Sequence, residues 1–439
     1  MYWLSKGIHR AGRLRRRSLI LLAVLGPGII TMVADNDAGG ISTYAVTGAK
    51  YGFSFLWVFL ILIPMAYYVQ EMTVRLGAVT KRGHGEAIFD AFGPFWGWFS
   101  IFDLALVNWL TLVTEYIGMI AAMSIFHIPP LVTFVVVTCI LMAVVMTGKY
   151  WTFEKLTLLF CVFNLVYIPA ALWAMRTSSA PAWGEVFKGF YRPHFPGGLN
   201  PDLIFYLMAN IGTTITPWQI FFQQSAVVDK GMDVRDLKFG KADTFAGSFL
   251  TGLVAVFIII TTAAAFYYHS PPIEVRDATD TAKALVPLLP HGKGEWAQIL
   301  FGIGLFDAGF LGALCISLST SWAVGEVFGW AHSLNKSVKD APWFYVIYLL
   351  TLGSAGSVVL ISPEHLLITI TMFVQVVAVT LLPACLFSLI LLLNDKPTMG
   401  QYANTRWQNI VNWGITIFVI LMSTVFAISV LFPELLKSM

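Results

Sequence analysis

The sequence contains few charged residues and few cysteines. Charged side chains make up 12% of the 439 residues and hydrophobic ones 57%, whereas soluble domains carry about 25% charged residues. A soluble chain of this length has no means of hiding so much apolar surface. The four cysteines form no Cys-x-x-Cys pair, so neither a thiolate metal cluster nor a disulfide framework is expected.

Catalytic signatures are also missing. We find no nucleophile–base pair, no cofactor motif and no soluble catalytic domain. An enzyme is therefore the least expected class, and we expect no cofactor. The composition gives no reason to expect a nucleic acid or a protein partner; the expected partners are the lipid bilayer and a transported solute.

What the chain does contain is long apolar blocks. Many exceed about 18 residues, the length that crosses a bilayer as a helix. Since lipid offers no hydrogen bonds to the backbone, such blocks must be helical, and they are too continuous for barrel strands, which alternate over about 10 residues. The sequence therefore predicts an all-α polytopic membrane protein. We expect about eleven spans, at 19–44, 53–77, 97–125, 130–147, 157–175, 201–227, 245–268, 297–329, 343–361, 365–393 and 410–432.

The basic residues predict the orientation of these spans. Most of the 27 Lys and Arg residues fall in the loops on the side of the N-terminus, including a basic segment at 1–18. Cytoplasmic loops carry such an excess. We therefore expect an integral plasma (inner) membrane protein with a cytoplasmic N-terminus and, because the number of spans is odd, an extracytoplasmic C-terminus.

Two spans should not be continuous helices. In the first, Asp35, Asn36 and Asp37 lie at mid-span, where a charged group costs at least about 2.5 kcal/mol, and the glycines that follow should weaken the helix further. In the sixth span, five spans later, Pro217 removes a backbone donor, so the helix should break near Thr213–Thr216.

A single kink in a membrane helix more often reflects packing than a site. Two interrupted spans in corresponding places are instead typical of transporters built from inverted repeats, whose substrate lies between the interruptions. Freed carbonyls and the carboxylate of Asp37 there suit a cation. The residues alone therefore favour a transporter of a small cation.

Several segments make the chain similar to the Nramp family of divalent-metal transporters. The resemblance covers nearly the whole chain. The segments that carry it are GPG at 26–28, the aspartate and glycines at 37–40, GAKYGFSFLW at 48–57, RLGAVTKRG at 75–83, TEYIG at 114–118, the sixth-span motif at 212–217, MFVQVVAVTLLP at 372–383 and NDKPTMGQYANTRW at 394–407. It implies a LeuT-type fold with two inverted five-helix repeats. These repeats would occupy 19–175 and 201–393, separated by an extracellular loop at 176–200 and followed by the eleventh span and C-terminus at 394–439.

The site motifs depart from the family pattern. Where the family has Asp-Pro-Gly-Asn, this chain has Asp37, Ala38, Gly39 and Gly40, and the family's sixth-span methionine stands here as Thr216. The resemblance thus implies a metal site at Asp37, Gly40, Thr216 and a backbone carbonyl of Thr213.

Loss of the methionine changes the expected metal. A thioether favours softer transition metals, and its removal leaves oxygen ligands, which suit Mg²⁺, an ion that keeps several waters and binds one or two carboxylates. The chain accordingly resembles the Nramp-related magnesium transporters, with Mn²⁺ as a possible second substrate.

Proton coupling should be weak or absent. The resemblance implies relay acids on the third span and a histidine on the sixth. Here Glu115 matches one acid, but the neighbouring acid position is Leu112 and the histidine position is Gln223. His84, by contrast, is expected in a loop.

Other polar residues near the breaks are open to two interpretations. Asp35 is either a second carboxylate near a hydrated ion or a hydrogen-bond partner of the unwound backbone. Trp218 is more readily a wall of the site than a ligand, and Gln375 either caps the site or packs. The remaining residues expected near the site are Asn36 and Gln219.

Four other functions compete with a Mg²⁺ carrier. They are an ordinary proton-coupled Mn²⁺/Fe²⁺ transporter, a carrier of small organic solutes, a non-transporting metal sensor on the same scaffold, and an enzyme. The replaced first-span asparagine argues against the first of these, and Asp37 at the break fits a cation better than an organic solute.

Overall fold

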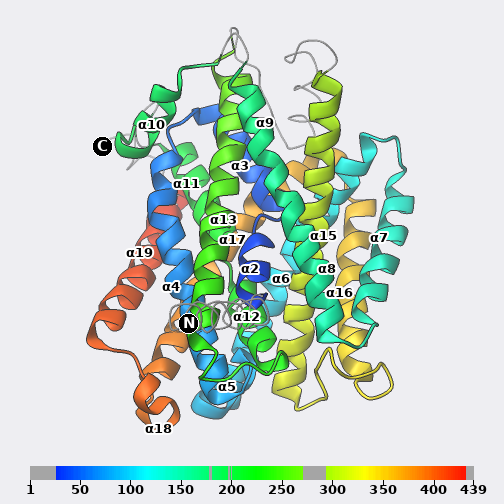
Figure 1. The fold of residues 1–439 in the computed structure, drawn as a ribbon, viewed down its shortest axis with the longest axis vertical. Coiled ribbons are helices and arrows are strands. Elements are labelled where there is room, and N and C mark those ends of the chain that lie inside the picture. The colour runs from blue at the N-terminus through cyan, green and yellow to red at the C-terminus, as the bar shows by residue number, and fades with distance from the viewer. Residues whose placement is uncertain (1–25, 177–179, 196–197, 199, 270–292, 432–439) are drawn as a thin grey trace, which may run out of the picture.

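We describe the chain from a computed structural model, which covers residues 26–176, 180–195, 198, 200–269 and 293–431. Every regular element in this part of the chain is a helix (Figure 1), which confirms the predicted fold class. The basic segment at 1–18 lies outside the described residues, so the orientation in the membrane stays a prediction.

The first half of the chain runs through the region expected for the first repeat. Its helices are α2 (Pro27–Val33), α3 (Ala38–Tyr51), α4 (Leu56–Thr80), α5 (His84–Phe92), α6 (Pro94–Ser124), α7 (Pro130–Val145), α8 (Tyr150–Phe163), the 3₁₀ segment η1 (Asn164–Val166), α9 (Tyr167–Ala174) and α10 (Trp183–Tyr191).

The second half repeats a broken helix at its start. Its helices are α11 (Pro201–Thr214), α12 (Pro217–Asp229), α13 (Leu237–Thr262), the π segment η2 (Ala263–Tyr267), α15 (Lys293–Phe328), α16 (Pro342–Ile361), α17 (Glu364–Asn394), α18 (Lys396–Met399), the 3₁₀ segment η3 (Gly400–Tyr402) and α19 (Arg406–Leu431).

Eight helical segments in the described part are long and apolar enough to cross a membrane. The other three expected spans differ from these for physical reasons. Two are split into half-helices, and the third, α7, is apolar but only 16 residues long. The total of eleven crossings therefore remains a prediction, although the described residues of each predicted span are mostly helical.

The two predicted breaks are present. Helix α2 ends at Val33 and α3 starts at Ala38, while α11 ends at Thr214 and α12 starts at Pro217. Proline suits the first position of a helix because the backbone N–H there has no partner within the helix. Both breaks lie inside the bundle, where α13 packs against α2 and α3, and α12 packs against α4 and α15 (Figure 1).

The glycines after Asp37 play a different role from the one predicted. Gly39 and Gly40 do not unwind the chain but lie in the first turn of α3. They are small because neighbouring helices come close: a Cβ on Gly39 would meet the side-chain amide of Gln375 on α17, and one on Gly40 would lie 2.7 Å from Thr213 Oγ1 on α11.

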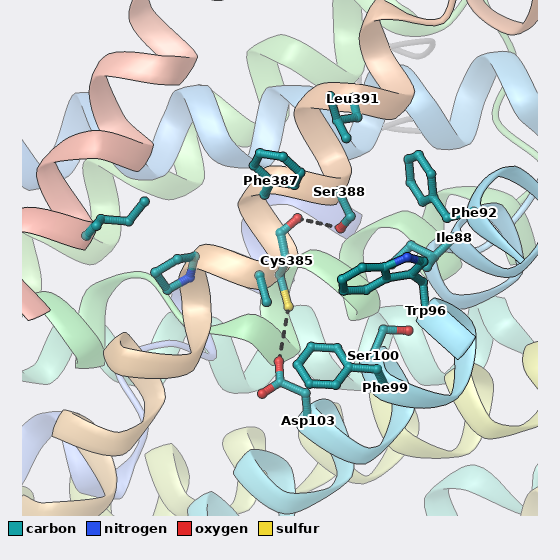
Figure 2. A pocket seen from close by; sticks show the side chains of 13 residues that line it. Ile88, Phe92, Trp96, Phe99, Ser100, Asp103, Cys385, Phe387, Ser388 and Leu391 are labelled. Atoms are coloured by element: carbon teal, nitrogen blue, oxygen red, sulfur yellow. Dashed lines mark hydrogen bonds between the residues drawn. The ribbon is translucent and has the colours of Figure 1, made fainter. Parts of the chain in front are cut away.

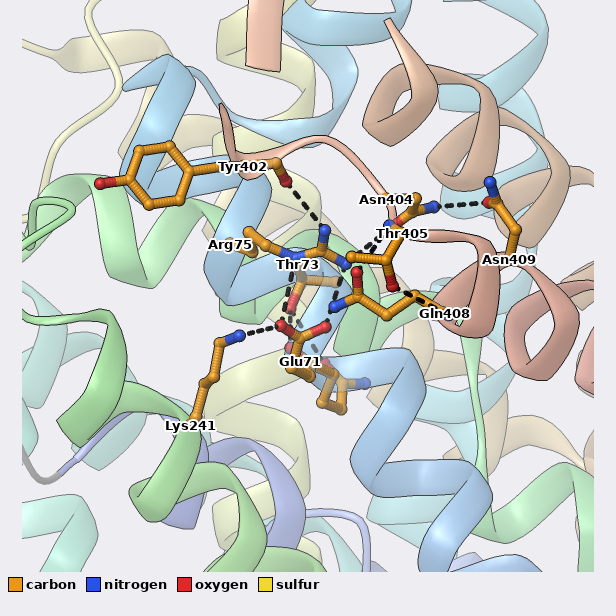
Figure 3. Close-up of polar contacts among 10 residues, drawn as sticks. Glu71, Thr73, Arg75, Lys241, Tyr402, Asn404, Thr405, Gln408 and Asn409 are labelled. Atoms are coloured by element: carbon orange, nitrogen blue, oxygen red, sulfur yellow. Dashed lines mark hydrogen bonds and ion pairs between the residues drawn. The ribbon is translucent and has the colours of Figure 1, made fainter. Parts of the chain in front are cut away.

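A buried charged network ties three elements at the end of the bundle that carries α5 and α18, here called the inner end (Figure 1). Glu71 accepts from Arg75 at 3.1 Å and from Lys241 on α13 at 2.6 Å. Arg75 also donates to the Tyr402 carbonyl at 2.9 Å and to Asn404 Oδ1 at 2.8 Å (Figure 3). Because removing one partner of a buried ion pair leaves an uncompensated charge, this network fixes α4, α13 and the segment before α19 together.

Candidate functional site

Asp37 forms the start of α3 at the first break. Its side chain is 1% exposed, and Oδ1 accepts the backbone N–H of Gly40 at 2.6 Å. This is the geometry of a helix N-cap, in which a carboxylate satisfies a free N–H of the first turn. The cap holds the carboxylate of Asp37 at the centre of the bundle.

Glu115 on α6 joins Asp37 from the other side. Its Oε2 accepts the N–H of Ala38 at 3.0 Å, and Oε1 accepts the Thr114 hydroxyl at 3.3 Å. The two acids lie together beside Gly312 on α15, since a Cβ there would lie 2.8 Å from Glu115 Oε2 and 2.9 Å from Asp37 Cβ. The predicted relay acid therefore contacts the predicted metal-binding segment directly.

The second break brings its own oxygens to the same place. A Cβ on Gly40 would lie between Thr213 Oγ1 and Asp37 Oδ1, at 2.7 and 3.2 Å. The absence of a side chain at Gly40 therefore leaves room for both oxygens. At the start of α12, Gln219 Oε1 accepts the Thr216 N–H at 3.1 Å, while the Thr216 hydroxyl has no hydrogen-bond partner.

Buried polar atoms without a partner gather around these breaks. Most buried polar groups in proteins are hydrogen-bonded, so such a concentration calls for an explanation. Within the described part of the chain, the unpaired atoms here are both carboxylate oxygens of Asp35, Asn36 Oδ1, Thr213 Oγ1, Thr216 Oγ1, Trp218 Nε1, Gln219 Nε2 and Gln375 Nε2. Several oxygen acceptors, two amide donors and one indole donor thus lack partners at or beside the two breaks.

The sequence left two interpretations open for Asp35 and two for Gln375, and the contacts of both residues bear on them. Asp35 is fully buried and accepts no hydrogen bond from the unwound backbone; its neighbour is the side chain of Gln219. Gln375 packs against both half-helices, because its backbone carbonyl contacts Gly212 and its amide contacts Gly39. Both residues therefore lie at the site rather than at a distance from it.

Asn36 and Trp218 support the site from its edges. Asn36 Nδ2 donates to the Thr251 carbonyl on α13 at 3.2 Å, and the Thr251 hydroxyl donates to the Met32 carbonyl at the end of α2. The Trp218 ring packs 6.0 Å from that of Phe222, and its carbonyl accepts the Ser319 hydroxyl. Trp218 is thus packed into the core at the start of α12.

Gln223 does not point to Asp37. Its amide donates to the Thr244 hydroxyl at 2.8 Å on α13. The prediction that His84 lies in a loop is wrong, because it is the first residue of α5 and is fully buried. Its ring packs edge-on against Phe221, and Nδ1 pairs with Gln224 at 3.0 Å. Burial lowers the pKa of His84 to about 4, so it is neutral at physiological pH.

Some site neighbours were missed by the sequence analysis. Gln70 on α4 contacts Gln219 Oε1 at 3.4 Å, and Gly312 makes room for the two acids. A buried glutamine within an apolar helix was a visible signal. The Gly312 contact was not, because it depends on how α15 packs against α3 and α6.

Acids and a lysine tie the half-helices α2 and α12 to their neighbours at the inner end. Asp243 on α13 accepts the backbone N–H groups of Gly26, Gly28 and Ile29 at 3.1, 2.7 and 3.3 Å, which holds the start of α2. At the end of α12, Lys230 pairs with Glu154 on α8 at 2.6 Å, with both side chains under 5% exposed. These contacts anchor the half-helices of both breaks at the inner end.

A separate apolar cavity of about 440 Å³ lies between α5, α6, α17 and α19. Asp103 lies at its floor, where it accepts the Cys385 thiol at 3.7 Å (Figure 2). No residue of the two breaks lines it, so it is not part of the candidate site.

The chemistry of the site is that of oxygen ligands. In the described residues, no group of three or more His, Cys, Asp or Glu side chains is arranged to hold a metal by itself. A cation bound here would therefore rely on one or two carboxylates, neutral oxygens and water, which are the ligands of hard cations.

Comparison with known proteins shows the family of the chain. A family profile described as "Natural resistance-associated macrophage protein-like" matches residues 28–429. The chain is 25% identical over 408 residues to a "Divalent metal cation transporter MntH" of Listeria innocua, covering 91% of this chain and 88% of that protein. It is also 25% identical to a "Natural resistance-associated macrophage protein 2 homolog" of Dictyostelium discoideum, covering 91% and 62%.

Solved structures show the same fold. A manganese transporter of Eremococcus coleocola superposes with a TM-score of 0.77 at 21% identity, covering 92% of this chain and 86% of that one. MhsT in complex with L-phenylalanine superposes with a TM-score of 0.62 at 13% identity, covering 92% and 98%. The LeuT-type architecture expected from the sequence is thereby confirmed.

Proposed function

Because the chain belongs to the Nramp family and is a divalent metal cation transporter in the membrane, we propose that its preferred substrate is hydrated Mg²⁺, with Mn²⁺ as a second substrate. We further propose that it imports these ions across the plasma (inner) membrane by alternating access with weak or no proton coupling. Asp37, Thr213, Thr216 and Gly40 are the proposed site.

The observation that carries this proposal is the set of unpaired oxygens at the two breaks. Asp35, Asn36 and Thr213 each present an oxygen without a hydrogen-bond partner in the described structure. Mg²⁺ dehydrates reluctantly and keeps several waters, and those waters are hydrogen-bond donors. A hydrated Mg²⁺ held by Asp37 would therefore satisfy acceptors that a bare ion of the same charge does not reach.

The absence of sulfur supports the same choice. Thr216 occupies the place of the family's methionine, and every proposed ligand is an oxygen. Hard oxygen ligands suit Mg²⁺, Ca²⁺ and Mn²⁺, whereas thioethers favour softer ions. Gly40 leaves room for the Thr213 hydroxyl, because a Cβ at this position would lie only 2.7 Å from it.

Weak proton coupling follows from the groups around Asp37. Gln223 is a neutral amide bound to Thr244, and Leu112 is apolar and fully buried. The acids that remain beside Asp37 are Glu115 on α6 and Asp35 in the same break. Uptake would then be driven by the membrane potential, which is worth about 2.3 kcal/mol per charge for each 100 mV and about twice that for a divalent ion.

Uptake into proteoliposomes tests the proposal. With the voltage set by potassium and valinomycin and a pH dye inside, we expect Mg²⁺ uptake that follows the voltage without acidification. Mn²⁺ uptake accompanied by protons, with no Mg²⁺ uptake, would overturn it. That result would establish the second candidate, a proton-coupled Mn²⁺/Fe²⁺ transporter, which is favoured by the direct contact of Glu115 with the Asp37 segment. Binding without any uptake would instead indicate a sensor.

Ligand softness gives a second test. In Thr216→Met, a thioether returns to the start of α12, and we expect Cd²⁺ affinity to rise about tenfold, equivalent to about 1.4 kcal/mol, while Mg²⁺ uptake falls. Isothermal titration measures the Cd²⁺ affinity. Thr424→Met, on the exposed face of α19, adds the same thioether away from the site and should change nothing. Equal Cd²⁺ affinity in wild type and Thr216→Met would contradict the role of Thr216.

A further inference from the structure

Asp307 is a buried acid that the proposed site does not use. It lies in the middle of α15 and is 3% exposed. Asn164 Nδ2 donates to its Oδ2 at 3.0 Å, while Oδ1 has no hydrogen-bond partner and no Lys or Arg of the described residues forms an ion pair with it. Intramembrane acids usually mark an ion site or a proton path.

Asp307 lies where one face of α15 packs against the segment that joins α8 to α9. On α15, Gly304 and Asp307 are three residues apart. Facing them, Asn164 and Tyr167 are also three residues apart, at the 3₁₀ step η1 between α8 and α9. A Cβ on Gly304 would lie 2.8 Å from the Tyr167 hydroxyl, so this glycine makes room for the hydroxyl one turn from the carboxylate.

Three buried oxygens at this interface have no partner among the described residues. They are Asp307 Oδ1, Asn164 Oδ1 and the Tyr167 hydroxyl, on side chains that are at most 3% exposed. A buried charge without compensation costs several kcal/mol, and unpaired buried acceptors add to that cost. A proton on Asp307 supplies one hydrogen bond, whereas a small cation coordinates several oxygens at once.

The charge of the cation follows from the single carboxylate. A divalent ion here would keep one uncompensated positive charge in a low-dielectric interior, whereas a monovalent ion is neutralised. Carboxylate, amide carbonyl and hydroxyl oxygens are ligands for hard cations. We propose that Asp307, Asn164 and Tyr167 bind Na⁺ at the interface of α15 with the η1 step.

This Na⁺ site is separate from the proposed metal site and does not rest on the proposed function. Its ligands come from α15 on one side and from the segment joining α8 and α9 on the other. Bound Na⁺ would therefore hold these two segments together and stabilise the folded protein.

Thermal unfolding of the purified full-length protein, without divalent ions, tests the site. With ionic strength kept constant by choline chloride, we expect the melting temperature to rise with the logarithm of the Na⁺ concentration once this exceeds Kd, because a ligand that binds only the folded state stabilises it by RT ln(1 + [Na⁺]/Kd). In Asp307→Asn, which keeps the shape of the side chain, the apparent Na⁺ affinity should fall at least about tenfold, equivalent to about 1.4 kcal/mol. Asp103→Asn, a second buried acid of the membrane region, is the matched control and should keep the Na⁺ response.

Several outcomes decide against the site. An equal Na⁺ response in wild type and Asp307→Asn would overturn it, and so would stabilisation of the wild type by low pH but not by Na⁺. If Asp307→Asn does not fold, Tyr167→Phe removes one oxygen only and should weaken binding of ²²Na⁺ to the purified protein. Unchanged ²²Na⁺ binding in Tyr167→Phe, or none in wild type, would reject the proposal. None of these measurements involves Mg²⁺ transport, so the proposed function can fail without affecting them.

Discussion

Asp37→Ala is expected to abolish divalent metal uptake while the protein still folds. The substitution removes the carboxylate that the break places at the centre of the bundle, next to Thr213 and Glu115. It also removes the cap of α3, which is worth about 1 kcal/mol of stability. That loss is small for a bundle with this much buried surface, so we expect a loss of transport of more than about 100-fold, equivalent to about 2.7 kcal/mol, with little change in the melting temperature. Uptake into proteoliposomes and thermal unfolding measure the two effects.

Two variants make the result specific. Asp37→Asn keeps the cap oxygen and the side-chain shape, so it should restore stability but not transport. Asp340→Asn removes a carboxylate from a loop where it accepts the Ser337 hydroxyl, and should transport normally. Metal uptake by Asp37→Ala at the wild-type rate would refute the assignment of the site.

Asp243→Ala is expected to open the inner end of the protein. Three backbone N–H groups at the start of α2 donate to this one carboxylate. Its removal leaves them without partners, at about 1–3 kcal/mol for each buried group. The contact between α2 and α13 should then be lost, so that the two helices separate. Labelling of a cysteine at Met32→Cys, which is fully buried in this structure, measures the opening.

Two further variants distinguish opening of the inner end from unfolding of the whole protein. In Asp243→Asn one oxygen still accepts, so the labelling rate should lie between those of wild type and Asp243→Ala. A cysteine at Leu386, fully buried on α17 away from α2, should stay unreactive in all three. Equal labelling of Met32→Cys in wild type and Asp243→Ala would show that this carboxylate does not hold the inner end closed.

Much of the fold could be predicted from hydropathy because lipid forces long apolar blocks into helices. The residues at which these helices begin and end were harder to predict. Helix α13 begins at Leu237, although its span was expected to start at 245. The start was placed too late because the first turns of the helix carry the charged residues Lys241 and Asp243. Hydropathy counts these residues as loop, whereas the structure pairs Lys241 with Glu71 and Asp243 with the start of α2. Such pairing depends on contacts distant in the sequence.

The candidate site, like the fold, could be predicted only in part from the sequence. Asp37 and Pro217 could be located because a charge and a proline at mid-span have local consequences. The roles of Gly39 and Gly40 could not, since both lie within a helix and their small size matters only where α11 and α17 approach. The same limit hid Gln70 and Gly312, and it hid the contact of Asp307 with Asn164, which depends on how α15 packs against the η1 step.

The network around Arg75 imposes an order on biogenesis. Glu71 and Arg75 emerge from the ribosome early, and Lys241 follows, which leaves two cations against one acid. The last acceptors of the guanidinium, the Tyr402 carbonyl and Asn404 Oδ1, belong to the segment before the final helix. Until that segment is synthesised, α4 carries unsatisfied donors inside the bundle. Synthesis of that segment is thus the step that satisfies the guanidinium, and a nascent protein truncated before Tyr402 would present the unpaired donors of Arg75 for membrane quality control to detect.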